Sequence, residues 1–478
     1  MVCTLGCDTL IRTTHPTMSK DFFITGRLSD SRKSYPAPRS EAPLLRWGAL
    51  ISVFKFHAAA AIFYGVVALC LGLPLLLTSC TGSTNRPVII WTSSPELASY
   101  VELFNASQEK AKAVVVYKEH TARSLPPARD EVPPDIVIGP WLKNSNTRKL
   151  FTPLDYLFNN QYIYRALFYP QLIDYGAISE KQYLLPLSFN LPVIVYNIKN
   201  ESFITNDQAL TLDAIKISAG NFNVKNKNDV YTAMGFAPSW NKDFLYVASK
   251  LFGASYREKG TSFSWNEKAM FSAVTYLHDW TMAQNTDTAA EQNFQFKYLY
   301  MPAYKQVSDG RCLFAYMTSD VLFTLTEEQA QGLSFRWIYE RERIPVEDAV
   351  ITLGLYKHSR NVKQAEVFIN WFFKEDTQTA LLERTAAMKL DTRTFGIAGG
   401  FSALRNVSEK VYPVYYRQLL GNLPAAEFLT MPNILPYRWP SLQEQVIIPY
   451  LQESTSTINE GQSQTLEERI TEWNKQYF

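Results

Sequence analysis

The stretch PVIIWTSSPELASYVELFN, Pro87 to Asn105, combines a short apolar run with the start of a helix. Val88 to Trp91 are continuously apolar, as in a strand buried on both faces. Ser94 suits the cap of the following helix and Pro95 its first turn. Apolar side chains then recur at helical spacing, at Leu97, Tyr100, Val101 and Phe104. This strand–helix unit predicts an α/β fold.

The same alternation continues along the chain. Further apolar strands are predicted at residues 113–117, 136–138 and 193–196. Helical patterns lie around residues 242–251 and 268–280, and another begins near Asn361. Apolar strands separated by amphipathic helices indicate sheets that are covered on both faces.

Length and charge narrow the class of protein. The chain has 478 residues, enough for two or three domains, and 46% of its residues are apolar, which excludes a largely disordered protein. The formal net charge is +2, and no basic stripe follows Cys80. Because nucleic-acid binding needs a basic face, no nucleic-acid partner is expected.

An apolar run near the N-terminus predicts export. Residues 58–77 carry no charge, and Arg46 and Lys55 precede them. Small residues then lead directly into Cys80. A basic region, an apolar core and small residues before a cut are typical of a secretory signal, here residues 53–79. The cysteine after them resembles a bacterial lipobox, in which Cys80 becomes the lipidated first residue.

Two alternatives compete with cleavage: an uncleaved membrane anchor and a buried helix. Pro74 and the small residues before Cys80 favour cleavage, and residues 80–86 then form a polar tether. Residues 1–52 are polar and too long for an ordinary signal start, so we interpret them as non-native or disordered. After cleavage Cys312 would be the one thiol beside Cys80, which predicts no disulfide and no cysteine metal site within one chain. No other metal site and no cofactor is expected.

Six segments in order resemble the extracellular solute-binding proteins of ABC importers, family 1, the maltose-binding-like group. They are PVIIWTSSPELASYVELFN, PPDIVIGPW, KQYLLPLSFNLPVIVYN, MGFAPSWNKDFLYVASKLFGAS, DGRCLFAYMTSD and LGLYKHSRNVKQAEVFINWFF. The resemblance covers nearly all of the chain from Pro87 to about Tyr450. It implies a type II periplasmic-binding fold with two α/β lobes and a ligand cleft between them.

The resemblance also implies how the lobes divide the chain. The first lobe is expected at residues 87–191 plus 320–376, and the second at 192–319 plus 377–460. Residues 461–478 are expected to form a C-terminal helix or tail outside both lobes.

Ligands of open α/β sheets bind outside the carboxyl ends of strands, so the loops there are the candidate site. In the first lobe the candidates are Thr92, Ser93, Ser94, Glu96, Trp141, Ser188 and Asn190. In the second lobe they are Tyr316, Ser319 and Asp320, in the segment where the chain returns, and Trp240, which the resemblance places in a sugar-stacking aromatic block of the family. Aromatic faces suit sugar rings, while Asn, Asp and Ser match hydroxyl groups.

Each candidate also has a structural interpretation. A large aromatic such as Trp141 or Trp240 more often packs in a core, and Tyr316 is open to the same reading. Thr92 to Ser94 can serve as a helix cap alone. The sequence alone leaves these alternatives open.

The sequence contains no G-x-S-x-G, H-E-x-x-H or P-loop motif, and its histidines are scattered, so no catalytic residue is predicted. We therefore expect a lipid-anchored substrate-binding protein that faces the periplasm or exterior. It would deliver a small solute, with a carbohydrate favoured, to an ABC permease. The alternatives are a carbohydrate-active enzyme and a surface or structural lipoprotein on the same two-lobe scaffold.

Overall fold

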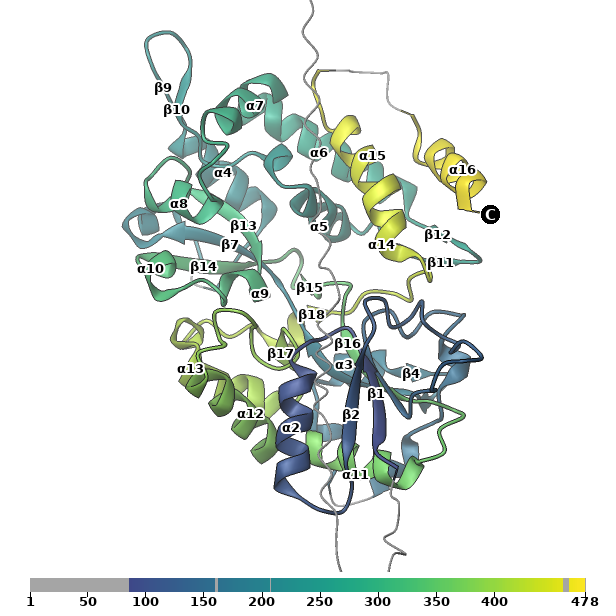
Figure 1. The fold of residues 1–478 in the computed structure, drawn as a ribbon. Helices are drawn as coiled ribbons and strands as arrows, with labels where there is room; N and C mark the ends of the chain where they lie inside the picture. The colour runs from purple at the N-terminus through teal and green to yellow at the C-terminus, as the bar shows by residue number, and fades with distance from the viewer. Residues whose placement is uncertain (1–85, 160–161, 207, 459–463, 478) are drawn as a thin grey trace, which may run out of the picture. The chain divides into compact units, whose positions relative to one another are not determined.

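The computed structural model describes residues 86–159, 162–206, 208–458 and 464–477 (Figure 1). The predicted extension 1–52, the signal peptide 53–79, Cys80 and the tether up to residue 85 lie outside the described residues. In the part that is described, none of the helices has the length and apolar content needed to cross a membrane.

The first lobe is built on a mixed sheet of six strands among the described residues. Their order is β17 (Phe401–Ser402), β6 (Leu184–Phe189), β16 (Ile351–Leu355), β3 (Ile136–Gly139), β1 (Val88–Thr92) and β2 (Ala113–Tyr117). β1 lies parallel to β2 and β3, with Thr92 beside Ile138. The loops that follow β1 and β3 therefore leave the same edge of the sheet.

β2 is the outer strand of this sheet, with β1 as its neighbour. Its side chains Val114, Val116 and Tyr117 are 42%, 36% and 60% exposed. Lys112 precedes the strand and Lys118 follows it.

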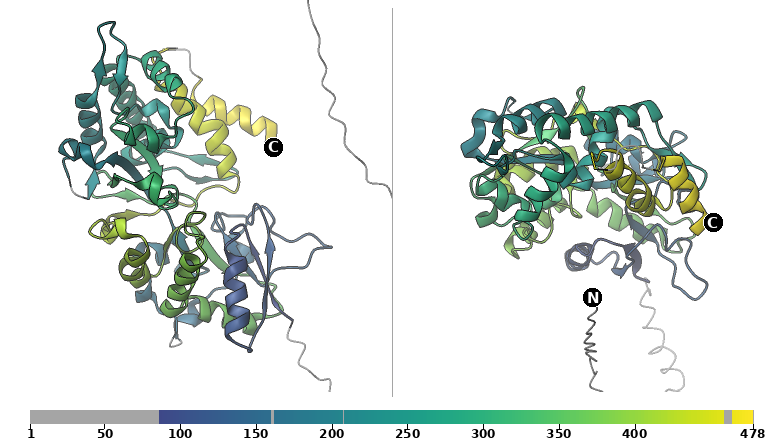
Figure 2. Two further views of the ribbon diagram at one scale, coloured as in Figure 1. Left: turned by 60° about the vertical axis from the view of Figure 1, so that its left-hand side comes forward. Right: turned by 90° about the horizontal axis from the view of Figure 1, so that it is seen from above.

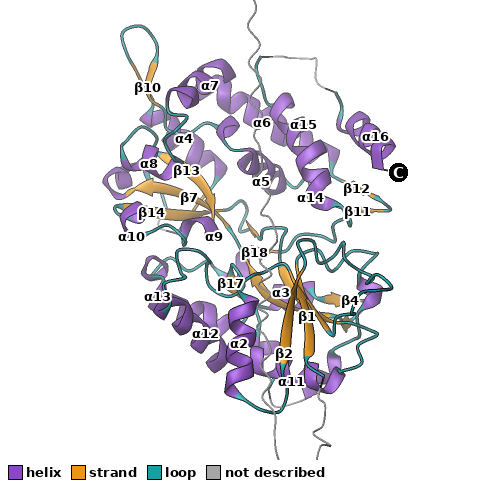
Figure 3. Cartoon of the chain, in the orientation of Figure 1, coloured by secondary structure: helices purple, strands orange, loops and turns teal. Residues whose placement is uncertain are grey.

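Helices pack on this sheet as the sequence predicts (Figure 3). They are α2 (Leu97–Ser107), α3 (Pro170–Tyr175), α11 (Val362–Phe372), α12 (Glu375–Ala387) and α13 (Tyr412–Tyr415). The predicted apolar face of α2 is buried. Its predicted cap is wrong, because the helix begins after Glu96 and no side chain caps it. The Ser94 carbonyl instead accepts a hydrogen bond from the Leu97 amide.

The second lobe is built on four strands in the described part of the chain. Their order is β13 (Phe314–Thr318), β7 (Pro192–Asn197), β14 (Leu333–Ile338) and β8 (Ala209–Leu210). β7 lies antiparallel to both β13 and β14. Two-stranded ladders complete the strands: β4 (Ala177–Ile178) with β5 (Lys181–Gln182), β9 (Val224–Lys225) with β10 (Tyr231–Ala233), β11 (Arg257–Lys259) with β12 (Ser262–Ser264), and β15 (Ile344–Pro345) with β18 (Leu429–Thr430).

Helices surround the second sheet, and the β9–β10 hairpin projects from it (Figure 2). The helices are α4 (Leu212–Phe222), α5 (Lys242–Phe252), α6 (Glu267–Gln284), α7 (Thr288–Lys297), α8 (Ala303–Ser308), α9 (Ser319–Leu322), α10 (Glu327–Ala330), α14 (Trp439–Leu442), α15 (Ile448–Ser454) and α16 (Leu466–Tyr477). The α/β prediction is confirmed.

The boundaries between the lobes differ from those expected. β14 pairs with β7 in the second sheet, although residues 320–376 are predicted in the first lobe. β17 pairs with β6 in the first sheet, and Gln378 of α12 accepts a hydrogen bond from Ser402, although residues 377–460 are predicted in the second lobe. The reason is that both strands complete antiparallel pairs with partners far away in sequence, which a local pattern does not reveal.

Stacked aromatic rings, here called the aromatic bridge, join the two lobes. The bridge consists of Phe323, Phe335 and Trp337 from the second lobe with Phe395 and Phe401 from the first. Phe323 stacks on Phe395 with ring centroids 4.8 Å apart, and Trp337 meets Phe401 at 5.9 Å. All five side chains are buried, so this part of the junction is apolar and tightly packed.

Candidate functional site

Chain crossings between the lobes are tied together at Asn190. Its Oδ1 accepts a 2.7 Å hydrogen bond from Ser319 Oγ, and its Nδ2 donates to the Gly399 carbonyl at 2.8 Å. The amide of Glu347 donates to the Asn190 carbonyl at 2.9 Å. Ser319 Oγ also accepts from the Leu191 amide at 3.1 Å. The predicted residues Asn190 and Ser319 therefore meet, and their side chains hold the crossing itself.

Next to the crossing lies a group of polar side chains, here called the acidic floor, which comprises Asp243, Tyr316, Asp320 and Glu347. Tyr316 is 6% exposed, and its hydroxyl has no hydrogen-bond partner among the described residues. The buried Glu347 Oε1 also has no hydrogen-bond partner in the described part of the chain. Asp243 and Asp320 reach the solvent. The structure thus brings the predicted residues Tyr316 and Asp320 together with two acids that the sequence analysis missed.

The acidic floor carries excess negative charge. The pKa of Glu347 is raised to about 7. Burial is the largest cause; the Lys250 ammonium opposes it, and the charges of Asp348, Asp320 and Asp243 add to it. Burial likewise holds the pKa of Tyr316 well above its usual value, and the same four carboxylates add to the effect. The Glu347 amide and the hydroxyl of Ser319, the neighbour of Asp320, both bond to Asn190, so these two acids lie close together at the crossing.

Asp348, the neighbour of Glu347, is fully partnered. It accepts a 2.7 Å hydrogen bond from Lys250 Nζ, a 3.0 Å hydrogen bond from Trp439 Nε1 and a further one from the Tyr246 hydroxyl. Lys250 also donates to the Val346 carbonyl at 3.0 Å. A buried charge with three donors is stable where it lies, so Asp348 anchors α5 to the crossing.

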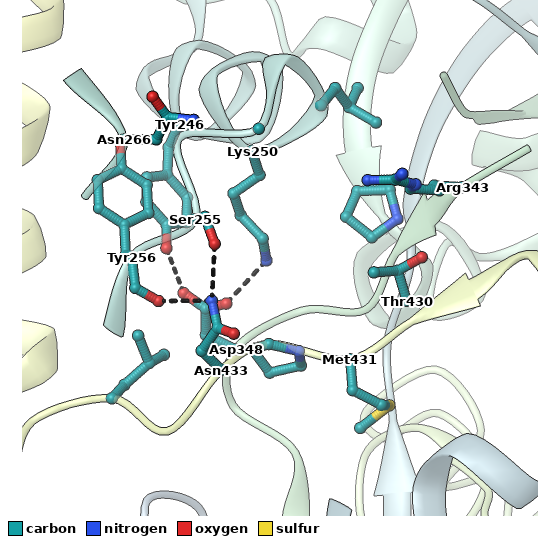
Figure 4. A pocket seen from close by; sticks show the side chains of 15 residues that line it. Tyr246, Lys250, Ser255, Tyr256, Asn266, Arg343, Asp348, Thr430, Met431 and Asn433 are labelled. Carbon is teal, nitrogen blue, oxygen red and sulfur yellow. Dashed lines mark hydrogen bonds and ion pairs between the residues drawn. The ribbon is translucent and has the colours of Figure 1, made fainter. Parts of the chain in front are cut away.

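A cavity of about 340 Å³ opens beside this anchor, between the end of α5, the β15–β18 ladder and residues 431–435 (Figure 4). Tyr246, Tyr256, Lys250 and Asp348 line it, together with Asn433, whose side chain donates to the Tyr256 carbonyl at 2.9 Å. Aromatic and hydrogen-bonding side chains thus share one cavity.

On the first lobe, Ser93 and Trp141 line a smaller cavity of about 60 Å³ together with Tyr437 and Pro440 of the C-terminal segment. Trp141 has a φ of 65°, an unfavourable backbone conformation for a bulky residue. Its ring packs against the apolar cluster that contains Tyr246 and Trp439. Strain of this kind is retained where the position of a side chain matters.

Polar contacts also cross between the lobes on this side. Glu258 of the β11–β12 hairpin accepts hydrogen bonds from Ser145 Oγ at 2.7 Å and from the Ser145 amide at 3.0 Å. The Tyr437 hydroxyl donates to the Arg123 carbonyl at 3.1 Å. These contacts are few and partly exposed, in contrast to the aromatic bridge.

The family model described as "Bacterial extracellular solute-binding protein" matches residues 127–379, more than half of the chain. The chain belongs to this family.

Solved structures show the fold of this solute-binding protein. The cyclic α-maltosyl-1,6-maltose binding protein from Arthrobacter globiformis is 15% identical, with a TM-score of 0.54 over 80% of this chain and 96% of the other. The sugar-binding protein MalE from Xanthomonas citri is 11% identical, with a TM-score of 0.58 over 82% and 96%. An ABC transporter solute-binding protein from Thermotoga lettingae, bound to α-D-tagatose, is 15% identical, with a TM-score of 0.52 over 82% and 98%.

No curated protein sequence matches the chain. The family and the solved structures confirm the predicted family and the two-lobed type II fold. The family assignment also confirms the prediction of a binding protein rather than an enzyme.

Several of the predicted site residues form side-chain hydrogen bonds within the first lobe. Thr92 Oγ1 accepts from the Ser94 amide at 3.0 Å, and both residues are buried. Glu96 accepts from Thr394 Oγ1 at 2.8 Å. Ser188 Oγ donates to the Ala398 carbonyl at 3.1 Å. These contacts hold loops in place and are separate from both cavities described above.

Trp240 lies in a different environment from Trp141. Its ring stacks on Phe294 at 5.4 Å with 15° between the planes, and its Nε1 donates to the Glu291 carbonyl at 3.1 Å. It packs against the apolar clusters of the second lobe. These contacts favour the core-packing alternative for Trp240.

Two signals in the sequence of the solute-binding protein point to the missed residues. Asp243, Tyr246 and Lys250 recur at helical spacing, so one face of α5 is polar and aromatic. Glu347 and Asp348 are adjacent acids inside an otherwise apolar run, PVEDAVITLGL. Acids in such a run are seldom a solvated surface, and their position therefore indicates a functional or structural junction.

Proposed function

We propose that this protein is a lipid-anchored substrate-binding component of an ABC importer, which captures a carbohydrate between its lobes and delivers it to the permease. The observation that carries this proposal is the pair of unbonded buried groups on the acidic floor, the Tyr316 hydroxyl and Glu347 Oε1. Unbonded buried polar atoms are costly, and a bound ligand would supply their partners.

The side chains around the floor support a carbohydrate. Tyr246 and Tyr256 line the larger cavity with aromatic rings, and Asn266 and Asn433 add polar side chains to it. The names of the Arthrobacter and Xanthomonas proteins describe them as sugar-binding proteins, which is consistent with this class of ligand.

We assign the predicted residues two roles. Ser93, Trp141, Tyr316 and Asp320 contact the ligand, because they line the cavity on the first lobe or belong to the acidic floor. Asn190 and Ser319 hold the crossing about which the lobes close. Closure would complete the site, and the ligand would stabilise the closed state.

A thermal-shift screen with mono- and oligosaccharides tests the proposal. A ligand at 100 times its Kd raises the free energy of unfolding by about 2.7 kcal/mol, which is an easily measured shift. The same sugar should stabilise Trp141→Ala less. A screen that finds amino acids or peptides but no sugar would overturn the carbohydrate assignment.

The lipid anchor is proposed from the sequence of the signal peptide, residues 53–79, and of the tether, residues 80–86. Cys80 would carry the lipid, and residues 1–52 would be dispensable. Cys80→Ala should leave an uncut precursor that takes up no labelled fatty acid, whereas the unaltered protein should be cut and labelled. An intact segment 53–79 in the unaltered protein from membranes would show that the run is an anchor.

A further inference from the structure

The acidic floor has more negative charge than its neighbours neutralise. Asp243, Asp320 and Glu347 belong to it, and Asp348 adjoins it. Lys250 lies 2.7 Å from Asp348, and its ammonium is also bonded to the Val346 carbonyl. Lys242, the other lysine of α5, forms its ion pair with Glu444. Lys250 and Lys242 therefore face the four carboxylates of this cluster, and Lys242 is shared between Asp243 and Glu444.

The unbonded groups lie within this charge. The Tyr316 hydroxyl is buried and has no hydrogen-bond partner among the described residues, and all four carboxylates raise its pKa. Glu347 Oε1 is also buried without a partner among the described residues. Two oxygens that can accept hydrogen bonds, surrounded by carboxylates, match a group with several N–H donors and a positive charge.

Asp348 differs from the other acids because three donors already occupy it. The free accepting capacity therefore lies on Glu347, Asp320 and Tyr316. Their oxygens come from three separate segments: the crossing, the start of α9 and β13. A protonated primary amine has three N–H bonds, one for each of these groups.

We propose that the site selects a positively charged saccharide, an amino sugar whose ammonium group binds Glu347, Asp320 and the Tyr316 hydroxyl. This inference rests on the proposed function, because it adds a charge to the carbohydrate ligand. The pKa of Glu347, about 7, supports it: in the free site this carboxylate binds a proton more tightly than an ordinary glutamate does, and the ammonium takes the place of that proton.

The test compares two disaccharides that differ in their amino groups. Calorimetry at pH 7 measures the affinity of the β-1,4-linked glucosamine disaccharide and of cellobiose, which has hydroxyl groups at the same positions. The glucosamine disaccharide should bind about tenfold tighter or more, since charge-assisted hydrogen bonds in a buried site contribute on that scale. Glu347→Gln keeps the shape and removes the charge, so the difference should fall below about threefold.

Two further variants control the result. Asp320→Asn alters a partly exposed acid of the floor and should reduce the preference in the same direction. Glu109→Gln alters an exposed acid at the end of α2 and should leave the preference unchanged. Melting temperatures of all three variants establish that each is folded before its affinity is interpreted.

The outcomes separate this inference from the proposed function. Equal affinity for the two disaccharides, or a preference for cellobiose, overturns the cation site and leaves a carbohydrate-binding protein. Binding of spermidine with neither disaccharide bound overturns both the amino-sugar inference and the carbohydrate assignment. Binding of calcium ion at Glu347 in place of the amine overturns the inference. Failure of both disaccharides and of spermidine to bind overturns it as well.

Discussion

The aromatic bridge and the acidic floor both lie where the lobes join, yet they are built from opposite chemistry. In the bridge, Phe323, Phe335 and Phe401 pack ring against ring and are buried. In the floor, the Tyr316 hydroxyl and Glu347 Oε1 are buried and have no hydrogen-bond partner among the described residues. The bridge stabilises one arrangement of the chain, whereas the floor gives up stability that a ligand can restore. Stability and binding are therefore divided between two regions of one junction.

Removing a ring from the bridge should have the largest effect. Phe401 is 1% exposed and contacts Phe395, Trp337 and Tyr412. Phe401→Ala should lower the free energy of unfolding by about 3–5 kcal/mol, because it leaves a cavity in packed aromatic rings. Denaturant unfolding measures the change.

Phe401→Leu is the matched control, since it fills most of the cavity and should cost clearly less. A loss below about 1 kcal/mol for Phe401→Ala would mean that the bridge is not what fixes the junction.

The two tryptophans sharpen the comparison between packing and binding. Trp240→Ala should lower stability by about 3 kcal/mol, because the ring stacks on Phe294 within the second lobe. Trp141→Ala should lower stability less and weaken ligand binding about tenfold, through the lost ring face.

Denaturant unfolding and calorimetry with the sugar found in the screen measure both quantities for each variant. If Trp240→Ala weakens binding more than Trp141→Ala without loss of stability, the assignment of the two roles is reversed.

The ionisation of Glu347 makes the loss of stability caused by the acidic floor measurable, because that loss depends on pH. Its pKa is about 7 in the folded protein, above the ordinary value of 4.5. The folded state therefore binds the proton more tightly than the unfolded state, so stability is highest at low pH and falls as pH rises from about 4.5 to 7. Glu347→Gln cannot ionise and should escape this loss.

In the absence of ligand, Glu347→Gln should gain on the order of 2 kcal/mol over the unaltered protein at pH 8 and little at pH 4.5. Melting curves at the two pH values measure this difference, and Glu109→Gln serves as the control. A gain that is equal at both pH values would show that the charge of Glu347 carries no cost.

The smallest effect is expected at the polar contact between the lobes. Glu258→Gln weakens the hydrogen bonds from Ser145 by removing the charge of the acceptor. Partly exposed contacts of this kind contribute about 0.5–1 kcal/mol, so ligand affinity should fall about two- to fivefold, since closure becomes less favourable. Calorimetry measures the affinity, and an unchanged value would mean that this contact does not depend on closure.

The sequence predicts local elements of this fold well. The apolar face of α2, with Leu97, Tyr100 and Phe104, is buried as expected. The spacing of these residues alone predicts a helix with one apolar face, and no distant partner is needed to recognise it. The lobe boundaries were predicted less well. β14 and β17 each pair with a strand more than 100 residues away, and no local pattern contains that information.

The candidate site follows the same rule. Tyr316 and Asp320 were predicted from the segment where the chain returns between the lobes, and the structure has them in β13 and α9, on the acidic floor. It missed Asp243 and Glu347, because their significance depends on a third element that brings them together. Trp240 was predicted from its place in a resembling segment, and only the stacked ring of Phe294 reveals its surroundings.

The outer strand β2 has a consequence for how the protein behaves in concentrated solution. Among the described residues no strand pairs with its outer edge, and Val114, Val116 and Tyr117 are exposed there. Such an edge is a template on which a strand from another molecule can add, which is a route to aggregation. The exposed Lys112 precedes the strand and repels the same strand of a second copy, whereas Lys118 after the strand is paired with Glu131. Resistance of the folded protein to self-association therefore depends on a positive charge at one end of this strand.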